Sequence, residues 1–253
     1  MSAFASFGII GYGHFGQLIG GSLANAGEVL VHDPDPAVAA QVTADHHPVR
    51  VAPLAEVAGC DVVILAVPFA ALSEVLALIR PLLGSTTVVM DVVSTKATVT
   101  ERLGAELGDH PNLLATHPLF GPPSMTELAP GQRLVVTFQR GERAAAFLAM
   151  LRRAFGLEIV EVSPDEHDRA MAYMQSLPFF IARALVDIGL LELPDKERLG
   201  IPSFEKLASI AAIEQHHTHE MFETSQLSNP YARQARLELL DALRRLQKEL
   251  DGE

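Results

Sequence analysis

The sequence predicts an α/β fold, in which a doubly wound, mostly parallel sheet forms the N-terminal part and an all-α part follows. Two observations carry this prediction. Up to about residue 162, short β-branched or apolar runs alternate with amphipathic stretches, which is typical of βαβ units. After Ser163 the strand pattern stops and apolar residues recur at helical spacing. We therefore expect two domains, residues 1–162 and 163–253.

Short apolar runs predict the strands of the sheet, and amphipathic stretches between them predict its helices. Several of the runs are apolar on both faces, as expected of parallel strands that helices cover on both sides. The strands are Phe7–Ile10, Val29–His32, Val62–Ala66, Thr87–Met90, Leu113–Ala115, Leu134–Thr137 and Glu158–Val162. The helices are Phe15–Ala26, Ala70–Leu83, Ala97–Leu107 and Arg143–Phe155.

The C-terminal part contains three stretches with helical periodicity, Asp165–Gly189, Ser203–Glu223 and Pro230–Leu250. Leu193–Pro202 carries two prolines and a glycine and is predicted to be a loop between helices. A helical domain of about 90 residues is small for an independent core, so we expect it to pack against a second copy and form a homodimer.

Composition and charge limit the possible function classes. The chain has 253 residues, of which 49% are hydrophobic and 20% charged, as is typical of a soluble globular protein. Its formal net charge of −12 argues against a nucleic-acid partner, because binding phosphates requires a basic face. A small anionic substrate is compatible with this charge where lysines, arginines or helix N-termini reverse the potential locally.

The cysteine content and the termini bear on localisation. Cys60 is the single cysteine, which excludes internal disulfides and a cysteine-based zinc site. The N-terminal residues lack the basic region of a signal peptide, and no apolar run reaches the roughly 18 residues that a membrane span needs. We expect a cytoplasmic protein that does not interact with membranes.

A glycine-rich motif follows the first predicted strand and opens a predicted helix. It reads Gly-Tyr-Gly-His-Phe-Gly and matches G-x-G-x-x-G, the fingerprint of Rossmann-type dinucleotide-binding sheets. The first glycine allows a tight turn, the second lets the backbone approach a pyrophosphate, and the third lets helix and strand touch. The residues expected to bind the cofactor here are Gly11, Gly13, His14, Phe15 and Gly16.

Asp33 follows the second predicted strand, about 20 residues beyond the first glycine of the motif. An acidic side chain at this position accepts hydrogen bonds from the ribose diol of adenosine and repels a 2′-phosphate, which favours NAD over NADP. The alternative is that Asp33 only forms the turn Asp33–Pro36.

Two further strand ends lie where a doubly wound sheet binds its ligand. Val67 and Pro68 follow one of them and either contact the cofactor or simply end the strand. Ser94 and Thr95 follow the other, and one of them is a helix N-cap unless Ser94 orients a catalytic imidazole or contacts a nicotinamide. Lys96 is expected to help neutralise a bound anion.

His117 lies in the segment Thr116–Pro122, which follows the predicted strand Leu113–Ala115. Histidine is the side chain most easily tuned to exchange protons near neutral pH. Beside a nicotinamide it would take the proton of an alcohol while the hydride leaves. The alternative is an ordinary loop histidine between a strand and two prolines.

Five segments in the order found here resemble one known family. They are Gly11–Gly16, Ser94–Lys96, His117–Pro122, His167–Arg169 and Met174–Pro178. Together they closely resemble the prephenate/arogenate dehydrogenases, over essentially the whole chain. The resemblance implies an NAD(P)-binding Rossmann domain, a helical dimerisation domain and an active site between them. It also implies that His117 is the catalytic histidine and that Ser94 is the family's catalytic serine.

The activity that the resemblance implies is the NAD-dependent oxidative decarboxylation of prephenate to 4-hydroxyphenylpyruvate in tyrosine biosynthesis. His117 would accept a hydrogen bond from the ring hydroxyl, hydride would pass to the nicotinamide, and loss of the ring carboxylate as CO2 would aromatise the product. Alternative substrates are arogenate or a 4-amino-4-deoxyprephenate-like cyclohexadienyl acid. A non-catalytic NAD-binding regulator is a further alternative.

Two positions depart from the family pattern. Phe179 replaces a histidine that the family usually has after its Leu-Pro pair, and Lys206 stands where members carry an arginine for a substrate carboxylate. Lysine offers a point charge in place of a bidentate fork, so substrate recognition is affected. The residues expected to contact the substrate are Lys206, Arg133, Arg183 and Gln175; the two arginines are otherwise solvated surface charges.

The cluster Glu214–Glu220 contains three histidines. His216 and Glu220 share one helix face, which is a spacing that metal ligands use. The cluster lacks the H-E-x-x-H order and a clear third ligand. We therefore expect no metal and interpret the cluster as a polar helix face or a dimer contact.

Overall fold

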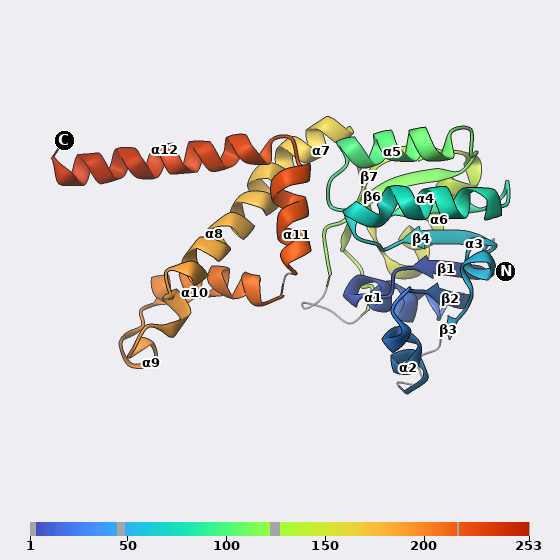
Figure 1. The fold of residues 1–253 in the computed structure, drawn as a ribbon, viewed down its shortest axis with the longest axis horizontal. Helices are drawn as coiled ribbons and strands as arrows, with labels where there is room; N and C mark the ends of the chain where they lie inside the picture. The colour runs from blue at the N-terminus through green and yellow to red at the C-terminus, as the bar shows by residue number, and fades with distance from the viewer. Residues whose placement is uncertain (1–3, 45–48, 122–126, 217, 253) are drawn as a thin grey trace. The chain divides into compact units, whose positions relative to one another are not determined.

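The computed structural model describes residues 4–44, 49–121, 127–216 and 218–252 (Figure 1). The chain divides into two compact units, Met1–Pro164 and Asp165–Glu253. The first unit contains the sheet and the second is helical, so each has its own architecture.

The first unit is built on an eight-stranded sheet with the order β3-β2-β1-β4-β5-β6-β7-β8. Every neighbouring pair is parallel except β6 and β7, which are antiparallel. The strands are β1 Ser6–Ile10, β2 Glu28–His32, β3 Arg50–Val51, β4 Val62–Leu65, β5 Val88–Asp91, β6 Leu113–Pro118, β7 Arg133–Arg140 and β8 Glu158–Glu161. The predicted doubly wound, mostly parallel sheet is confirmed.

Successive residues of a strand point to opposite faces of the sheet, and here apolar residues on both faces pack against helices. Ile9 packs with α1 and α6 residues such as Leu18 and Phe147, whereas Ile10 packs in a second core with α4 residues such as Leu76. The α-helices of this unit are α1 His14–Leu23, α2 Pro36–Ala44, α3 Leu54–Ala58, α4 Leu72–Ile79, α5 Ala97–Leu107 and α6 Glu142–Phe155. Strands that are buried on both faces account for the nearly continuous apolar runs in the sequence.

The strand order reverses between β1 and β4, since β1 pairs with β2 on one side and with β4 on the other. Open α/β sheets bind ligands at such a switch point, beyond the carboxyl ends of the strands. We call the side of the sheet at which β1, β2, β4, β5 and β6 end the carboxyl edge, and the opposite side the amino edge.

The structure differs from the predicted elements at two places that matter for the site. The strand β6 continues to Pro118, so His117 lies within a strand and its predicted place in a loop is wrong. Residues 117 and 118 remain in the sheet because antiparallel β7 supplies partners for them, Val135 and Leu134. The elements β3, α2 and α3 were also not predicted: β3 and α3 are too brief to show periodicity, and the nine-residue α2 has no clear polar face.

The second unit contains only helical elements among its described residues, which confirms the predicted all-α part (Figure 1). They are α7 Pro164–Met171, η3 Ala172–Ser176, α8 Leu177–Asp187, η4 Leu190–Glu192, α9 Lys196–Leu199, α10 Pro202–Ala211, η5 Ala212–His216, α11 His219–Glu223, η6 Thr224–Ser228 and α12 Ala232–Asp251. The stretch Leu193–Pro202, predicted as a loop, includes the single helical turn α9.

A buried polar network joins the two π-helical turns of this unit, η3 and η6. The Ser176 hydroxyl donates to the Ser225 carbonyl at 2.8 Å, and the Gln226 amide donates to the Ser176 carbonyl at 2.6 Å. Arg236 of α12 in turn donates to the Gln226 side-chain oxygen at 2.7 Å. Wide π turns leave backbone carbonyls without their usual helical donors, and these side chains satisfy them.

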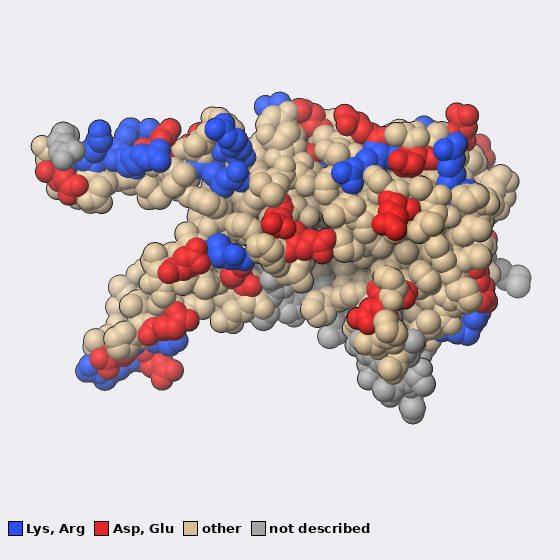
Figure 2. All heavy atoms as spheres, in the orientation of Figure 1, with Lys and Arg blue, Asp and Glu red and all other residues tan. Residues whose placement is uncertain are grey.

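Basic side chains are concentrated on the last helix. Figure 2 shows lysine and arginine side chains gathered along α12, which carries five of the 19 basic residues of the chain. Four acidic residues are interleaved with them, so the helix is nearly neutral as a whole. Within the described part of the chain, no helix is both long and apolar enough to cross a membrane.

Candidate functional site

The glycine motif after β1 has the three geometries that dinucleotide binding requires. Gly11 has a φ of +89°, and a Cβ atom there would lie 2.4 Å from the Ala66 carbonyl oxygen. A Cβ atom on Gly16 would lie 2.2 Å from the Gly11 carbonyl oxygen, so helix and loop touch at this point. Gly13 faces open space, with nothing within 4 Å of a Cβ position. A pyrophosphate can therefore approach the backbone at Gly13.

The helix α1 begins directly after this open glycine. Gly13 is its N-cap residue and provides no side chain to cap the first amides, and the first turn contains no acidic residue. Free N–H groups at a helix start favour an anion. His14 is exposed at this position and Phe15 is half-buried.

Asp33 is fixed against the glycine motif. One carboxylate oxygen accepts a hydrogen bond from the Tyr12 amide at 2.7 Å, and the other accepts from the Asp35 amide at 2.9 Å. The bond from the Asp35 amide is the one expected if Asp33 forms the turn Asp33–Pro36, so that turn is present. Each carboxylate oxygen has a second lone pair, so the same geometry leaves acceptors for a ribose diol.

Val67 and Pro68 lie beside the glycine motif. The Val67 side chain comes within 3.1 Å of a Cβ position on Gly11. Pro68 is exposed and precedes the 3-10 turn Phe69–Ala71. Arg102 of α5 holds this turn, because its guanidinium donates to the Phe69 carbonyl at 2.9 Å and covers the Phe69 ring at 4.0 Å.

The loop after β5 contains Ser94, which is half-buried at the carboxyl edge. The helix α5 begins at Ala97 with Lys96 in the N-cap position, so the N-cap alternative for Ser94 or Thr95 is wrong. Lys96 is completely buried, and its ammonium contacts Asp91 and the Thr116 carbonyl. The prediction that Lys96 neutralises a bound anion is therefore also wrong.

Asp91 is the buried partner of this lysine at the end of β5. One of its oxygens accepts from the Lys96 ammonium at 2.5 Å and from the Val93 amide at 3.0 Å. The other accepts from the Thr116 amide at 3.1 Å. Burial raises the pKa of the Asp91 carboxyl, and the ammonium and the two amides oppose that shift because they stabilise the carboxylate.

His117 lies near the carboxyl end of β6 and is only 5% exposed. Its strand partner is Val135 on β7, and the Leu119 amide donates to the Arg133 carbonyl at 2.9 Å. A bulge separates this pairing from the preceding one, since the register shifts between Ala115 and Thr116. Bulges of this kind are common next to active sites, where they redirect a side chain.

The segment after His117 packs against the glycine motif. The rings of Phe120 and Phe15 lie 6.3 Å apart, and a Cβ atom on Gly121 would lie 3.9 Å from the Phe15 ring. The strand that carries the histidine is therefore attached to the start of the predicted cofactor helix. Pro122, the last residue of the predicted motif, lies outside the described residues.

Arg133 begins β7 at the same edge as His117. Its side chain is 65% exposed and lies 3.7 Å from Glu158, which is a loose surface ion pair. This arginine remains available to a second anionic partner.

The other predicted substrate contacts belong to the helical unit. Arg183 is paired with Glu214 through its Nε atom at 2.5 Å and covers the Phe222 ring, so it is not a solvated surface charge. Lys206 is exposed on α10 and Gln175 is half-buried in η3. Phe179, which is expected to stand where the family has a histidine, is buried in α8.

The described residues contain no group of three or more side chains placed to hold a metal ion. In the cluster Glu214–Glu220, the Glu214 carboxylate is already paired with Arg183. His217 lies outside the described residues.

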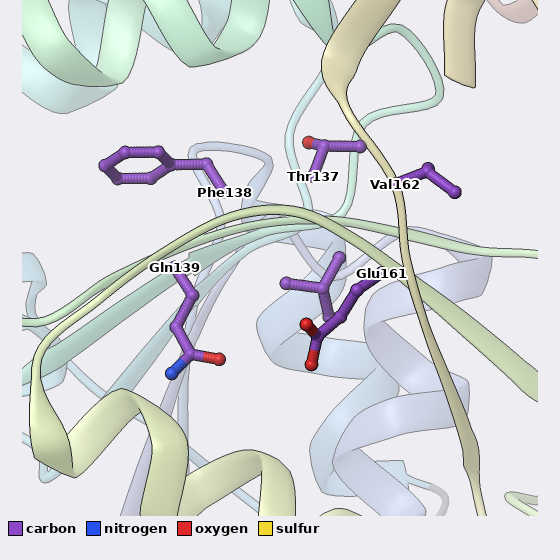
Figure 3. Close-up of a pocket in the computed structure, with 6 residues that line it drawn as sticks. Thr137, Phe138, Gln139, Glu161 and Val162 are labelled. Carbon is purple, nitrogen blue, oxygen red and sulfur yellow. The ribbon is translucent and has the colours of Figure 1, made fainter. Parts of the chain in front are cut away.

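An opening of about 320 Å³ lies at the far side of β7 from β6 (Figure 3). It arises because β8 ends at Glu161 while β7 continues to Arg140. In Figure 3, Thr137 and Phe138 point to one side of the sheet, whereas Gln139 and Glu161 point to the other. The side chains do not converge on one space, so this opening is a gap at the sheet margin rather than a binding site.

Comparison with known proteins decides the family. Residues 19–153 match the family described as prephenate dehydrogenase, nucleotide-binding domain, which is more than half of the chain. The chain belongs to the prephenate dehydrogenase family. The matched range includes Asp33, Ser94 and His117 but begins after the glycine motif, so the motif is independent support for nucleotide binding.

One relative from the family is distantly similar in sequence. A probable arogenate/prephenate dehydrogenase from Methanocaldococcus jannaschii is 23% identical over 159 residues, which are 59% of this chain and 34% of that protein. The chain thus spans about a third of the length of this relative.

Solved structures share the fold across both units. Prephenate dehydrogenase from A. aeolicus, in complex with hydroxyphenyl propionate and NAD+, matches with a TM-score of 0.79 and 20% identity, over 98% of this chain and 91% of that one. Arogenate dehydrogenase from Synechocystis matches with a TM-score of 0.68 and 20% identity, over the same shares of the two chains.

Proposed function

We propose that the chain is an NAD-dependent dehydrogenase that converts prephenate to 4-hydroxyphenylpyruvate by oxidative decarboxylation. One observation carries the proposal. The segment after His117 packs through Phe120 and Gly121 onto Phe15 of the glycine motif, so a buried histidine and a dinucleotide-binding turn share one edge of the sheet. Family membership and the ligands of the A. aeolicus structure support the choice of substrate and cofactor.

The residues at this edge fit NAD. The open backbone at Gly13 and the uncapped start of α1 would hold the pyrophosphate, and Asp33 would accept the ribose hydroxyls. Val67 and Pro68 would border the cofactor, since they adjoin Gly11. When bound, NAD supplies the hydride acceptor of the reaction.

His117 is the proposed general base. It would take the proton of the C4 hydroxyl while the C4–H bond breaks, and bound NAD would accept the hydride. The bond between the ring and its carboxylate would then break, its electron pair would aromatise the ring as CO2 leaves, and His117 would return its proton to the phenolate oxygen. A positioned base contributes about 10²- to 10⁴-fold in rate, and orientation of the substrate supplies much of the remainder. Ser94, on the adjacent loop, would orient the imidazole or contact the nicotinamide.

The substrate is anionic, so cationic side chains must bind it. Arg133 is at the same edge as His117, and its present partner Glu158 is weakly held. Lys206, Arg183 and Gln175 of the helical unit stay predictions as substrate contacts. Of these, Arg183 would have to exchange its bond to Glu214 for a bond to the substrate.

We further propose that the protein is a homodimer through its helical unit. The apolar residues Leu243, Leu246 and Leu250 of α12 are between 51% and 83% exposed in the single chain. Exposed leucines at helical spacing are typical of an interface. Sedimentation analysis of the purified protein tests this: a dimer is expected, and a monomer at micromolar concentration would contradict it.

A related substrate is the second candidate. The resemblance implies that Phe179 and Lys206 stand where the family has its substrate-binding histidine and arginine. An apolar ring and a point charge would suit a cyclohexadienyl acid with other polar groups, such as arogenate or a 4-amino-4-deoxyprephenate-like compound.

A substrate panel with both cofactors tests the proposal. Prephenate, arogenate and the amino analogue are each offered with NAD and with NADP, and turnover is followed as absorbance of the reduced cofactor. We expect turnover of prephenate with NAD. Turnover confined to arogenate or to the amino analogue would establish the second candidate. Binding of NAD without turnover of any of the three would instead identify a non-catalytic regulator.

A further inference from the structure

The sheet loses its regular pairing immediately before His117. On one side of β6, pairing with β5 ends at Asp91 opposite Ala115. On the other side, the register with β7 shifts between Ala115 and Thr116. The residue that precedes the proposed base therefore lies beyond the end of one ladder and at a bulge in the other.

Side chains from the neighbouring loop bind Thr116 in place of the lost ladder. The Thr116 amide donates to the Asp91 carboxylate at 3.1 Å, and the Thr116 carbonyl accepts from the Lys96 ammonium at 2.5 Å. The Thr116 hydroxyl donates to the Asp91 carbonyl at 2.5 Å. All three residues are completely buried.

The same ion pair also defines the loop that carries Ser94. Asp91 is the last residue of β5, and Lys96 directly precedes α5, so the pair joins the two ends of this loop at an Nζ–Oδ1 distance of 2.5 Å. The Asp91 carboxylate also accepts from the Val93 amide, next to Ser94. One buried pair thus contacts both segments that carry the proposed catalytic side chains.

A buried ion pair such as Asp91–Lys96 need not make the folded protein more stable. Removing two charges from water is costly, and well-packed apolar residues of similar volume are often at least as stable. A buried pair with full hydrogen bonding does fix one geometry, because its donors and acceptors have few alternative partners in the protein interior. At a reacting centre, such precision has a large effect on rate.

We propose that Asp91 and Lys96 are positioning residues that fix Thr116, and through it the placement of His117 relative to the Ser94 loop. The proposal rests on the proposed function only for the roles of His117 and Ser94. We call the contacts of Asp91 and Lys96 with Thr116 the clamp. Independently of catalysis, the clamp should protect the backbone amides at the end of β6 against hydrogen exchange.

Two substitutions of Thr116 test the proposal by kinetics. Thr116→Val removes the hydroxyl that donates to the main-chain carbonyl of Asp91 and keeps the volume, whereas Thr116→Ser keeps the hydroxyl. Thr87→Val is the matched control, because Thr87 is also buried and donates its hydroxyl to a carbonyl, that of Cys60 at 3.1 Å, at the amino edge. We expect Thr116→Val to lower kcat about tenfold or more with the KM for NAD unchanged. Thr116→Ser should recover most of the loss, and Thr87→Val should lower Tm similarly while kcat stays unchanged.

Hydrogen–deuterium exchange tests the clamp without turnover. In the double variant Asp91→Asn with Lys96→Met, both charges are removed together. Exchange in the peptide that spans residues 113–121 should become at least tenfold faster, while peptides from β1 and β4 keep their protection. Unchanged exchange in 113–121, or uniformly faster exchange throughout the sheet, would overturn the clamp.

The two measurements separate the two proposals. If the wild-type protein turns over none of the substrates while residues 113–121 lose protection as expected, the function is wrong and the clamp stands. If turnover is present and the two valine variants lose kcat equally, the positioning role is wrong and the function stands.

Discussion

Two aspartates at opposite edges of the same sheet have similar partners. Asp61, directly before β4, accepts from the Ala5 amide at 2.8 Å and pairs with Arg143 at 3.0 Å. Asp91, at the end of β5, accepts from the Thr116 amide at 3.1 Å and pairs with Lys96 at 2.5 Å. In both places a carboxylate binds the backbone of a neighbouring segment and a cation balances its charge.

The two pairs differ in burial, and the buried pair lies at the edge where we propose the active site. Side chains of the Asp61 pair are about a third exposed, whereas those of the Asp91 pair have no exposed surface. A partly hydrated pair costs little to form and contributes little to stability. A dry pair has a large desolvation cost, and this is why we propose a positioning role for the pair that contacts Thr116 and Val93.

Substitution of His117 should have the largest effect. His117→Asn removes the proposed base at the carboxyl edge, so we expect kcat to fall by about 10²- to 10⁴-fold, or roughly 3–5 kcal/mol, with NAD affinity retained. Steady-state kinetics and a titration with NAD measure the two quantities. The matched control is His110→Asn, because His110 contacts the Thr87 carbonyl at the amino edge at 2.8 Å. Near wild-type kcat in His117→Asn would show that another group is the base.

The two ion pairs should differ in their contribution to folding. Lys96→Met leaves the Asp91 carboxylate buried without its cation, so the free energy of unfolding should fall by about 3–5 kcal/mol. Arg143→Met breaks a partly exposed pair and should cost roughly 1 kcal/mol or less. Denaturant titrations of both variants measure the difference. Equal losses would mean that burial does not distinguish the two edges.

Cys60, next to Asp61, provides a pH-dependent probe of the amino edge. Burial raises the pKa of its thiol to about 11, above the ordinary value of 9.0. The folded state therefore favours the protonated thiol. Its contribution to stability is complete below about pH 9 and is lost as the pH rises through about 11, and two pKa units correspond to about 2–3 kcal/mol.

The measurement is the free energy of unfolding between neutral and strongly alkaline pH, for wild type and Cys60→Ala. We expect the variant to lose less stability on going to high pH than the wild type does. The native thiol should also react with a disulfide reagent far more slowly than the unfolded one. A steeper pH dependence in Cys60→Ala would contradict the direction of the shift.

Asp33 should change cofactor choice at the carboxyl edge with the smallest free-energy effect. Asp33→Asn removes the charge that repels a 2′-phosphate, so the preference for NAD over NADP in kcat/KM should fall about tenfold, or roughly 1.4 kcal/mol. Asp35→Asn removes the same charge two residues away, where the carboxylate caps the Ala37 amide at 2.9 Å, and should leave the preference unchanged. A wild-type preference for NADP would refute the role of Asp33.

Local patterns in the sequence were sufficient to predict the sheet apart from its edge strand β3, the helical second part and the geometry of the glycine motif. The long apolar runs of β1, β4 and β5 and the spacing of Gly11, Gly13 and Gly16 depend only on neighbouring residues. The position of His117 within β6 could not be predicted, because its strand partner Val135 lies in antiparallel β7.

The polar contacts of Asp91, Lys96 and Thr116 were missed for a similar reason. These residues are up to 25 positions apart and meet only when β5 and β6 align. One signal was present in the sequence: an aspartate ends an otherwise apolar strand, and a lysine follows five residues later. A charge at the end of a fully buried strand requires a partner, and Lys96 is the nearest cation along the chain.

The two margins of the sheet have a consequence for self-association. The outermost strand β3 has only two residues, and the opposite outermost strand β8 has four, with a glutamate at each end. Short and charged margins disfavour the addition of a further strand from another molecule. Such margins therefore disfavour amyloid-like stacking of the very apolar inner strands.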